Sequence, residues 1–326
     1  MDMSFRKLIY ISAVILAAIA CKKEEETTVS PSLEGTLIIE GLPEFIAPGQ
    51  AVTLTPKGAI HPDGGEIGYS WKVSPSMTKY DTTRVFNHTF SDTLRTYTVY
   101  CTAFAEGYAT SSSITYTTAV APGPNGSIQG IRFKDIAEDT VYVKHMPYYY
   151  KAIGTQTWTL NNMAVRTGIP FRNTDLMSEV FGRYYNFVEA KDACDSLDTA
   201  TQNWELPSVA DWETLVSYIS GNPTYGLTIT AAMMAPATFN GIKMYDYWPI
   251  IGDITNGSGF SALTSGYANT VARSFRGEKE YAVFWTSDEA SDSEGYYKYL
   301  ISDEPGLFTG KGDKASFGAS VRCIRK

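Results

Sequence analysis

The chain has 326 residues, of which 44% are hydrophobic and 19% are charged, and its formal net charge is -8. This length allows two independent hydrophobic cores, because single domains usually run to roughly 100–200 residues. The acidic balance argues against nucleic acid as a partner, since phosphates attract basic surfaces.

Residues 1–20 have the pattern of a secretory signal. Arg6 and Lys7 precede an apolar run, residues 8–20, that is too short to span a bilayer, which takes about 20 residues. The segment AIAC ends at Cys21 and resembles the lipobox of bacterial lipoproteins. That resemblance implies cleavage before Cys21 and lipidation of its side chain. The alternative is a free cysteine at an ordinary cleavage site.

The acidic residues Glu24, Glu25 and Glu26 follow the predicted lipid site. They resemble the export signal that carries Bacteroidetes lipoproteins to the outer face of the outer membrane. The resemblance implies a lipid-anchored protein exposed at the cell surface, held by more than one acyl chain. Residues 21–34 would form a flexible tether.

Residues 35–120 show the short alternating runs of a β-sandwich. The runs GTLIIE, AVTLT, GYSWKV, TYTVYCTAF and SSSITYTTA are bounded by Gly, Pro and Asp. In the strand predicted for GYSWKV, Trp71 lies on the same face as the apolar residues two positions before and after it. In the strand predicted for TYTVYCTAF, Cys101 likewise lies on the same face as apolar residues at alternate positions. Trp71 is therefore predicted to be a core residue, and Cys101 a small buried hydrophobe.

The sandwich resembles PKD-type and bacterial immunoglobulin-like modules. The likeness lies in the pattern FNHTF followed by TYTV, whereas the W-D-F-G-D signature of PKD modules is replaced by SWKVSP. His88 is expected to form a local hydrogen bond, and His61 stands in the turn-like segment HPDGG. Neither is expected to bind metal, because a metal site needs three or four converging ligands.

The segment APGPNGS, residues 121–127, is the predicted linker, and residues 128–326 form a second domain with two helical signals. In one of them, Ser208 and Asp211 have the spacing of a capping box. Apolar residues, Trp212 among them, then recur every three or four positions on one face. We therefore expect the acids to cap and solvate the helix start, and Trp212 to enter the core.

The other helical signal is NFVEAKDACDSL, which places Cys194 on the same stripe as Phe187 and Ala190. The second domain offers only Cys323 as its partner. Two cysteines in one domain of an exported chain are expected to be bridged. Closing so long a loop would stabilise the fold by roughly 4 to 5 kcal/mol.

Six blocks of the second domain resemble, in order and spacing, the Fibrobacter succinogenes major paralogous domain. The resemblance implies a C-type-lectin-like α+β fold with two helices and twisted antiparallel sheets. It also implies that Cys194 and Cys323 form the bridge and that Trp204 and Trp212 are fold residues. Trp158 and Trp285, which stand in two of the blocks, are likewise predicted to be core residues. The blocks are QTWTLNNM, GRYYNFVEAKDAC, WELPSVADWETL, GFSALTSGY, FWTSDEA and SFGASVRCIRK.

The same fold houses formylglycine-generating enzymes, but the residues argue against catalysis. Such an enzyme needs two reactive cysteines, and here only Cys323 lies near the end of the chain, with a partner already expected. His145 is the one histidine of the second domain, so a Ser-His-Asp triad has no further support. The adjacent acids Asp288 and Glu289 would point to opposite faces of a strand. No phosphate-binding or dinucleotide motif occurs. We therefore predict no catalytic residues and no cofactor.

Binding is the favoured class of function. The E-P-N, Q-P-D and W-N-D motifs of calcium-dependent lectins are absent, so calcium has no motif behind it, although Asp288 and Asp292 could hold an ion. The long insertion FNGIKMYDYWPIIGD, residues 239–253, clusters aromatic rings around a carboxylate. Such a cluster suits a sugar face or a protein interface. The predicted ligand-binding residues are Tyr245, Asp246, Tyr247 and Trp248; alternatively, these rings fill the loop's own small core.

Three functions remain, in decreasing order of preference. The first is a surface-anchored adhesin or glycan-binding lipoprotein, with the sandwich as spacer and a glycan or surface protein as partner. The second is a structural or protein-interaction component of an envelope assembly. The third is a formylglycine-generating-type enzyme, which would require two free thiols in the second domain.

Overall fold

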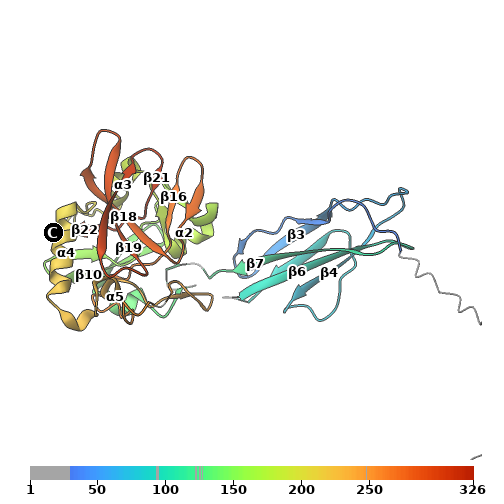
Figure 1. Ribbon diagram of the computed structural model, residues 1–326, viewed down its shortest axis with the longest axis horizontal. Coiled ribbons are helices and arrows are strands. Elements are labelled where there is room, and N and C mark those ends of the chain that lie inside the picture. Colours follow the sequence, from blue (N-terminus) through green and yellow to red (C-terminus); the bar gives the residue numbers. More distant parts are fainter. Residues whose placement is uncertain (1–29, 93–94, 122, 125, 127, 247) are drawn as a thin grey trace, which may run out of the picture.

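The computed structural model describes residues 30–92, 95–121, 123–124, 126, 128–246 and 248–326. The predicted signal peptide, the lipidation site Cys21, the acidic export signal and most of the predicted tether lie outside these ranges. The chain is mostly β-sheet and forms two bodies that lie end to end along the long axis (Figure 1). No helix in the described part combines the length and the apolar character needed to cross a membrane.

The first body is a sandwich of two sheets, and each run predicted as a strand forms one. One sheet has the order β1-β3-β5 and the other the order β2-β7-β6-β4. All neighbours are antiparallel except β2 and β7, which pair in parallel. The strands are β1 (Ile38–Glu40), β2 (Phe45–Ile46), β3 (Gln50–Lys57), β4 (Gly68–Ser74), β5 (Phe86–Phe90), β6 (Arg95–Phe104) and β7 (Ser111–Ala119).

The alternation of β4 and β6 places one face of each strand in the core. Trp71 is fully buried and stacks on Phe86, with ring centroids 5.4 Å apart. Cys101 is buried and free, and burial raises the pKa of its thiol to about 12. A thiol that stays protonated at neutral pH is a poor nucleophile, so Cys101 contributes packing.

The two histidines of the sandwich form hydrogen bonds within the sandwich, and only that of His61 is local in the sequence. The Nδ1 atom of His61 accepts a hydrogen bond from the backbone N–H of Asp63 at 3.2 Å. The Nε2 atom of His88 lies 3.1 Å from Oγ of Ser76. Burial lowers the pKa of His88, which favours the neutral ring.

The sandwich begins before the predicted boundary at residue 35. Leu33 is buried in the sandwich core, and the backbone of Glu34 pairs with that of Ile60. The N–H of Ala109 donates to the carbonyl of Pro31 at 2.8 Å. A single apolar side chain in a polar segment is enough to dock these residues, because its burial is favourable by about 2 kcal/mol.

The second body contains five small sheets. Their orders are β22-β11-β10-β9, β12-β13, β15-β14-β8, β17-β16-β21 and β18-β19-β20. The strands are β8 (Ile128–Gln129), β9 (Asp139–Val143), β10 (Met146–Ile153), β11 (Gln156–Thr159), β12 (Ile169–Pro170), β13 (Arg183–Tyr184), β14 (Thr238–Phe239), β15 (Ile242–Lys243), β16 (Tyr267–Asn269), β17 (Ser274–Arg276), β18 (Tyr281–Glu289), β19 (Glu294–Ile301), β20 (Leu307–Asp313), β21 (Phe317–Gly318) and β22 (Ile324–Arg325).

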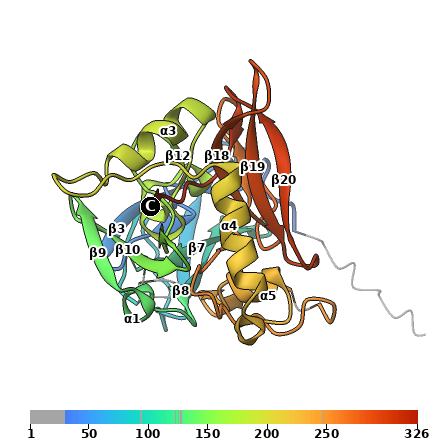
Figure 2. The same ribbon diagram turned by 90° about the vertical axis from the view of Figure 1, so that its left-hand side faces the viewer.

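The two predicted helices are α3 (Phe187–Asp195) and α4 (Val209–Ser220), and both begin with a capping box. In α4, Oγ of Ser208 accepts from the N–H of Asp211, whose carboxylate accepts in return from the N–H of Ser208 at 2.9 Å. Figure 2 shows α4 standing beside the sheet of β18, β19 and β20, with α3 separate from it. Trp212 of α4 packs against Trp158 and Phe284 in the core.

Asp211 differs from the prediction, because it is buried and not solvated. Its carboxylate contacts Lys326 at 3.2 Å as well as Ser208, and its backbone carbonyl accepts from the side chain of Gln156. Burial alone would raise the pKa of Asp211, but the hydrogen bonds from Ser208 and Lys326 lower it overall. Asp211 therefore caps α4 and also connects this helix to the end of the chain.

The second body also contains short helices that no periodicity predicted. The largest, α2, ends at Gly182, where φ is +80° and an added Cβ would lie 2.5 Å from Cβ of Asn162. Helices this short carry too few turns for a readable apolar stripe. They are α1 (Phe133–Ile136), α2 (Asp175–Phe181) and α5 (Ile229–Met233), with 3-10 turns η1 (Phe171–Asn173) and η2 (Pro223–Tyr225).

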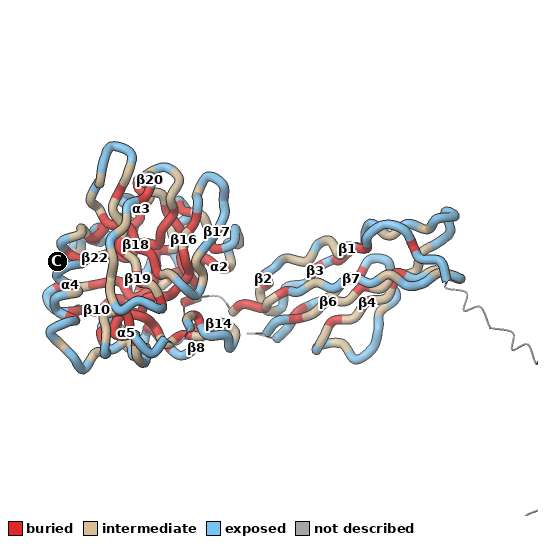
Figure 3. Tube along the Cα trace, in the orientation of Figure 1, coloured by how far each residue is buried: buried red, intermediate tan, exposed pale blue. Residues whose placement is uncertain are grey.

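The expected bridge between Cys194 and Cys323 is present and closes a sequence separation of 129 residues. It joins α3 to the segment that leads into β22. The five tryptophans expected in the core are all buried. Figure 3 shows that the buried stretches of the second body gather in its interior, around β16 and β18. They are Trp71, Trp158, Trp204, Trp212 and Trp285.

The two bodies contact each other through β2. Phe45 of β2 packs against Phe171 and Phe239, with ring centroids 6.4 and 6.3 Å apart. Beside these rings, Arg172 forms a two-pronged ion pair with Glu278, at 2.9 and 2.8 Å, and a further pair with Glu44 of the sandwich. The junction is therefore an aromatic contact with a charged edge.

Candidate binding site

The structure separates the residues predicted to bind ligand in the insertion 239–253. Tyr245 is partly buried against the core cluster that holds Trp212, and burial raises its pKa. Asp246 is exposed and Trp248 exposes 44% of its surface, whereas Tyr247 lies outside the described residues. One ring of the insertion therefore faces the core and another faces solvent.

The adjacent acids Asp288 and Glu289 have structural partners. The carboxylate of Asp288 accepts from the backbone N–H of Val209 at 2.5 Å and so also caps α4. Glu289 pairs with Lys191 at 3.3 Å and Lys314 at 3.0 Å. Throughout the described ranges, no group of three or more His, Cys, Asp or Glu side chains could hold a metal ion.

The central sheet of the second domain presents a row of tyrosines on the face opposite α4. In β18, Ala282 and Phe284 pack in the cluster with α4, so alternation places Tyr281 and Val283 on the other face. The pairing of β18 with β19 sets Tyr299 directly opposite Val283. Tyr297 and Tyr299 lie two residues apart in β19 and therefore share that face.

These tyrosines continue into a ring network with residues from β16 and β21. Tyr267 lies edge-on to Tyr281 with ring centroids 6.0 Å apart, and it stacks on Phe317 at 5.6 Å. Phe317 in turn stacks on Tyr297 at 4.6 Å. Each ring is held by another, so the surface they form is pre-organised and loses little side-chain entropy on binding.

The rings enclose a hollow of about 340 Å³, which we call the tyrosine groove. The ring of Tyr297 lies over Gly310 of β20, where a Cβ would be only 2.3 Å from Cζ of the tyrosine. Glycine at this position is therefore required for the ring to lie flat against the sheet. The groove is lined by Tyr267, Tyr281, Val283, Tyr297, Tyr299, Ile301 and Phe317.

A polar hollow of about 390 Å³ adjoins the tyrosine groove and shares Tyr267 and Phe317 with it. Its polar lining comes from the β16–β17 hairpin, from β20 and from the turn between β20 and β21. One carboxylate oxygen of Asp313 accepts from the N–H and the hydroxyl of Ser316, at 2.8 and 2.7 Å. The polar lining residues include Asn269, Ser274, Arg276, Lys311, Asp313 and Ser316.

Two tyrosines of the groove, Tyr281 and Tyr297, have pKa values above the usual one and so stay neutral near physiological pH. Burial raises the pKa of Tyr297, and the neighbouring Tyr299 and Tyr267 raise it further. Burial and the nearby Glu280 raise the pKa of Tyr281. A neutral phenol both donates and accepts hydrogen bonds. The groove therefore combines apolar ring faces with hydroxyl groups, which suits an uncharged ligand of the same mixed character.

Sequence reasoning missed the tyrosine groove, because its lining comes from four strands that the fold brings together. One local signal was available: in EGYYKYLI, Tyr297 and Tyr299 alternate with Lys298 and Leu300. Two tyrosines on one face of a strand indicate a surface that is apolar and able to hydrogen-bond.

Two solved structures are similar to this chain at low sequence identity. The solution structure of the PKD domain of human SorCS2 matches with 11% identity and a TM-score of 0.23, covering 36% of this chain and 95% of that chain. The adhesin InvE of Yersinia pseudotuberculosis matches with 10% identity and a TM-score of 0.24, covering 90% of this chain and 71% of that one. A search of curated proteins finds no match.

The sequence pattern of the Fibrobacter succinogenes major domain matches residues 152–325, more than half of the chain. This range contains α3, α4, the disulfide and the whole tyrosine groove. The protein therefore belongs to the Fibrobacter succinogenes major domain family.

Proposed function

We propose that this protein is a non-catalytic binding protein and that its second domain takes a carbohydrate in the tyrosine groove. The observation that carries the proposal is the groove itself, where tyrosine rings from three strands line a hollow of about 340 Å³. Ligand sites are typically concave and mostly apolar, with a few placed polar groups.

Sugars present both apolar C–H faces and hydroxyl groups. Ring faces such as those of Tyr281 and Tyr299 suit the former, and the phenol hydroxyls suit the latter. In the adjoining hollow, Asn269 and Asp313 offer amide and carboxylate groups that can bind further hydroxyls. Because the two hollows adjoin, with volumes of about 340 and 390 Å³, they suit an oligosaccharide with one unit on the rings and the next among the polar groups.

The proposal extends to the whole chain. We propose a lipoprotein anchored through Cys21 in the outer membrane and exposed at the cell surface, with a glycan or surface protein as its partner. The sandwich then serves as a spacer, since the described chain begins at the end of the sandwich away from the second domain (Figure 1). We also assign the second domain to the C-type-lectin-like fold, on the basis of helices α3 and α4 and the bridge from α3 to the chain end.

Two observations support a binding role without catalysis or calcium. The bridge between Cys194 and Cys323 occupies both cysteines of the second domain, whereas a formylglycine-generating enzyme needs free thiols. The carboxylate of Asp288 already accepts a hydrogen bond at the start of α4, which leaves it fewer lone pairs for a calcium ion. We therefore expect binding that survives a chelator.

A second candidate function, a protein-interaction surface, is favoured by apolar side chains near the insertion. Leu227, Trp248 and Ile250 expose 78%, 44% and 62% of their surfaces. The segment that contains Leu227 lies beside the insertion that contains Trp248 and Ile250, because the hydroxyl of Thr228 donates to the carbonyl of Ile251 at 3.1 Å. Contiguous exposed apolar side chains commonly mark a contact with another protein.

A glycan-array screen of the chain without residues 1–21 tests the proposal, run with calcium and with a chelator. We expect chelator-resistant binding that is lost in Tyr299→Ala and largely kept in Tyr299→Phe, which retains the ring. Tyr116→Ala removes an exposed tyrosine from the sandwich and is the matched control. Binding lost in Trp248→Ala but kept in Tyr299→Ala would assign the site to the insertion. Silence across the array, with capture of an envelope protein that needs Trp248, would favour the second candidate.

A further inference from the structure

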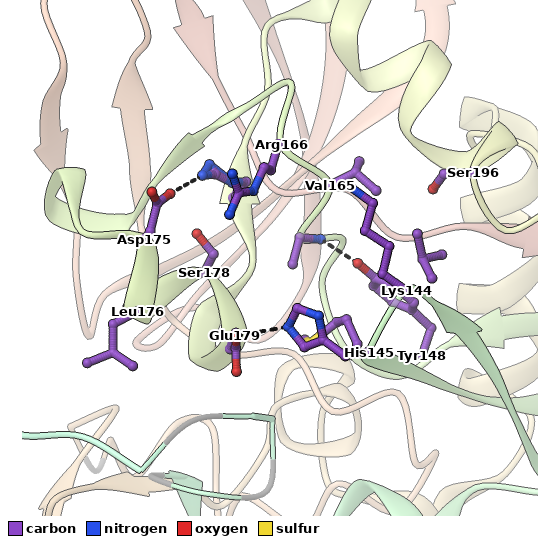
Figure 4. A pocket seen from close by; sticks show the side chains of 14 residues that line it. Lys144, His145, Tyr148, Val165, Arg166, Asp175, Leu176, Ser178, Glu179 and Ser196 are labelled. Atoms are coloured by element: carbon purple, nitrogen blue, oxygen red, sulfur yellow. Dashed lines mark hydrogen bonds and ion pairs between the residues drawn. The ribbon is translucent and has the colours of Figure 1, made fainter. Parts of the chain in front are cut away.

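A second hollow, of about 430 Å³, lies on a different part of the second domain and has a charged lining. We call it the α2 pocket, because α2 forms one of its sides and the β9–β10 turn another. In Figure 4 Ser178 and Glu179 of α2 lie on one side, and Lys144 and Tyr148 lie on the other. None of its lining residues belongs to the tyrosine groove.

Two buried polar atoms in the lining lack a hydrogen-bond partner within the described structure. They are Oγ of Ser178 and Nε of Arg183, and each residue exposes only 6% of its surface. A buried polar group without a partner is costly, so such groups in a native fold call for an explanation. A ligand that accepts a hydrogen bond from both would remove the cost.

The rest of the Arg183 guanidinium is fixed in place. One terminal nitrogen donates to the carbonyl of Gly168 at 3.0 Å, and the other forms an ion pair with Asp175. A guanidinium held in this way presents its Nε–H in a fixed direction, where it can donate one charge-assisted hydrogen bond to a carboxylate. In this ion pair the side chain of Arg183 is buried, whereas that of Asp175 is largely exposed to solvent.

The charges of the pocket leave two cations without carboxylate partners. Asp175 is paired with Arg183, and Glu179 with His145 at 3.2 Å. The other cations in the lining, Lys144 and Arg166, are exposed and form no ion pair within the described ranges. The pocket therefore has an excess of positive charge in a chain whose net charge is -8.

The remaining wall is apolar. It includes Val143, Met146, Val165 and Leu176. The ring of Tyr148 also lines the pocket, and its hydroxyl accepts a hydrogen bond from the N–H of Ala164 at 3.0 Å. An inorganic anion would leave this wall facing water. A ligand with one carboxylate and an apolar body would cover both parts of the lining.

We infer that the α2 pocket binds a small organic carboxylate, with its carboxylate on Arg183 and Ser178, its charge balanced by Arg166 and Lys144, and its apolar part on Val165 and Leu176. Acidic sugars and N-acylated amino acids share this chemistry. The inference does not depend on the tyrosine groove.

Isothermal titration calorimetry of the full chain in mild detergent tests the inference with two acids and their neutral counterparts. The pairs are N-acetylneuraminic acid with its methyl ester, and N-acetylleucine with N-acetylleucinamide. We expect at least one acid to bind and its neutral counterpart to bind at least tenfold more weakly, since a charge-assisted hydrogen bond is lost. Which acid binds distinguishes the two sources. Equal binding of acid and neutral form, or no heat from either acid, would overturn the inference.

Two variants separate a ligand site from a structural role. Arg166→Gln removes an exposed charge and is expected to weaken acid binding about tenfold with the melting temperature unchanged; Arg84→Gln in the sandwich is its control. Ser178→Ala removes an unpartnered buried hydroxyl, so it should raise the melting temperature of the free protein while weakening acid binding about tenfold. A stabilised Ser178→Ala protein that binds as tightly as the parent would contradict the assignment.

Discussion

The sandwich and the second domain satisfy their backbone hydrogen bonds in different ways. In the sandwich, long ladders between β4, β6 and β7 do most of this. Thr117 is the one buried polar side chain there, among the residues described. The second domain has comparable ladders between β18, β19 and β20, but its described residues from Met244 to Gly266 form neither helix nor strand, and buried side chains anchor them.

Arg322 shows how this anchoring works. Its fully buried guanidinium donates to Oδ1 of Asn162 at 2.6 Å and to the carbonyls of Thr159, Phe260 and Ser261 at 2.8–2.9 Å. Burial lowers its pKa to about 9, so it stays charged at neutral pH. The rings of Phe260 and Phe284 lie 5.0 and 5.5 Å from its centre. One cation thus ties the irregular segment to β11 and the chain end.

The largest effect expected to separate the domains comes from the disulfide. Replacing Cys194 and Cys323 with Ala should lower the free energy of unfolding of the second domain by about 4–5 kcal/mol, because the bridge closes a separation of 129 residues. Hydrogen exchange along a urea titration, resolved by peptide, reports each domain separately. The sandwich should be unchanged, and Cys101→Ala should show the reverse pattern. Equal loss in both domains would contradict their independence.

Arg322→Met tests the polar anchor and should destabilise the second domain by about 3 kcal/mol, since three buried carbonyls lose their donor. Exchange protection should fall first at residues 258–264. Arg322→Lys keeps the charge but not the fork of donors, so it should recover only part of the loss. A Met variant as stable as the parent would contradict this role. It would show that apolar packing at this position stabilises the domain as well as the buried charge does.

Asp211→Asn tests the cap of α4, with an expected loss of about 1 kcal/mol at neutral pH. The folded pKa of Asp211 is lowered by Ser208 and Lys326 despite burial. Its stabilisation is therefore complete above the unfolded pKa, near 4, and is lost as the pH falls through the lower folded value. Urea titrations between pH 7 and pH 2 should show a shallower acid loss in the variant. If the free energy of unfolding falls equally with pH in the variant and the parent, Asp211 does not contribute to the acid sensitivity of the domain.

The smallest effect is expected at the junction. Arg172→Ala removes the pairs with Glu44 and Glu278, which are partly exposed, so the stability of either domain should change by less than about 1 kcal/mol. Small-angle X-ray scattering should instead show a broader range of interdomain angles. Arg95→Ala, which removes an ion pair within the sandwich, is the control. If the scattering does not change, the ion pairs of Arg172 do not restrict the interdomain angle, and the aromatic contacts of Phe45 are sufficient to hold the junction.

The sequence was most informative where structure is local and periodic. Alternation predicted β4 and β6 with their buried faces, and the spacing of Ser208 and Asp211 predicted the start of α4. The bridge of Cys194 to Cys323 followed from the small number of cysteines and from the family resemblance.

What the sequence left open depends on contacts between distant segments. The burial of Asp211 requires Lys326 at the chain end, and the tyrosine groove requires β16, β18, β19 and β21 together. The α2 pocket depends on a seven-residue helix with no readable stripe and on the unpartnered atoms of Ser178 and Arg183. No spacing rule places such groups before the fold is known.

The most direct test of the central claim is where a glycan from the array lands on the protein. The ring-proton NMR signals of a tyrosine-labelled chain can be followed as that glycan is added. We predict shifts for Tyr267, Tyr281, Tyr297 and Tyr299, with the signals of Tyr116 in the sandwich unmoved. Saturable binding that leaves all four groove tyrosines unshifted would contradict the assignment of the tyrosine groove as the carbohydrate site.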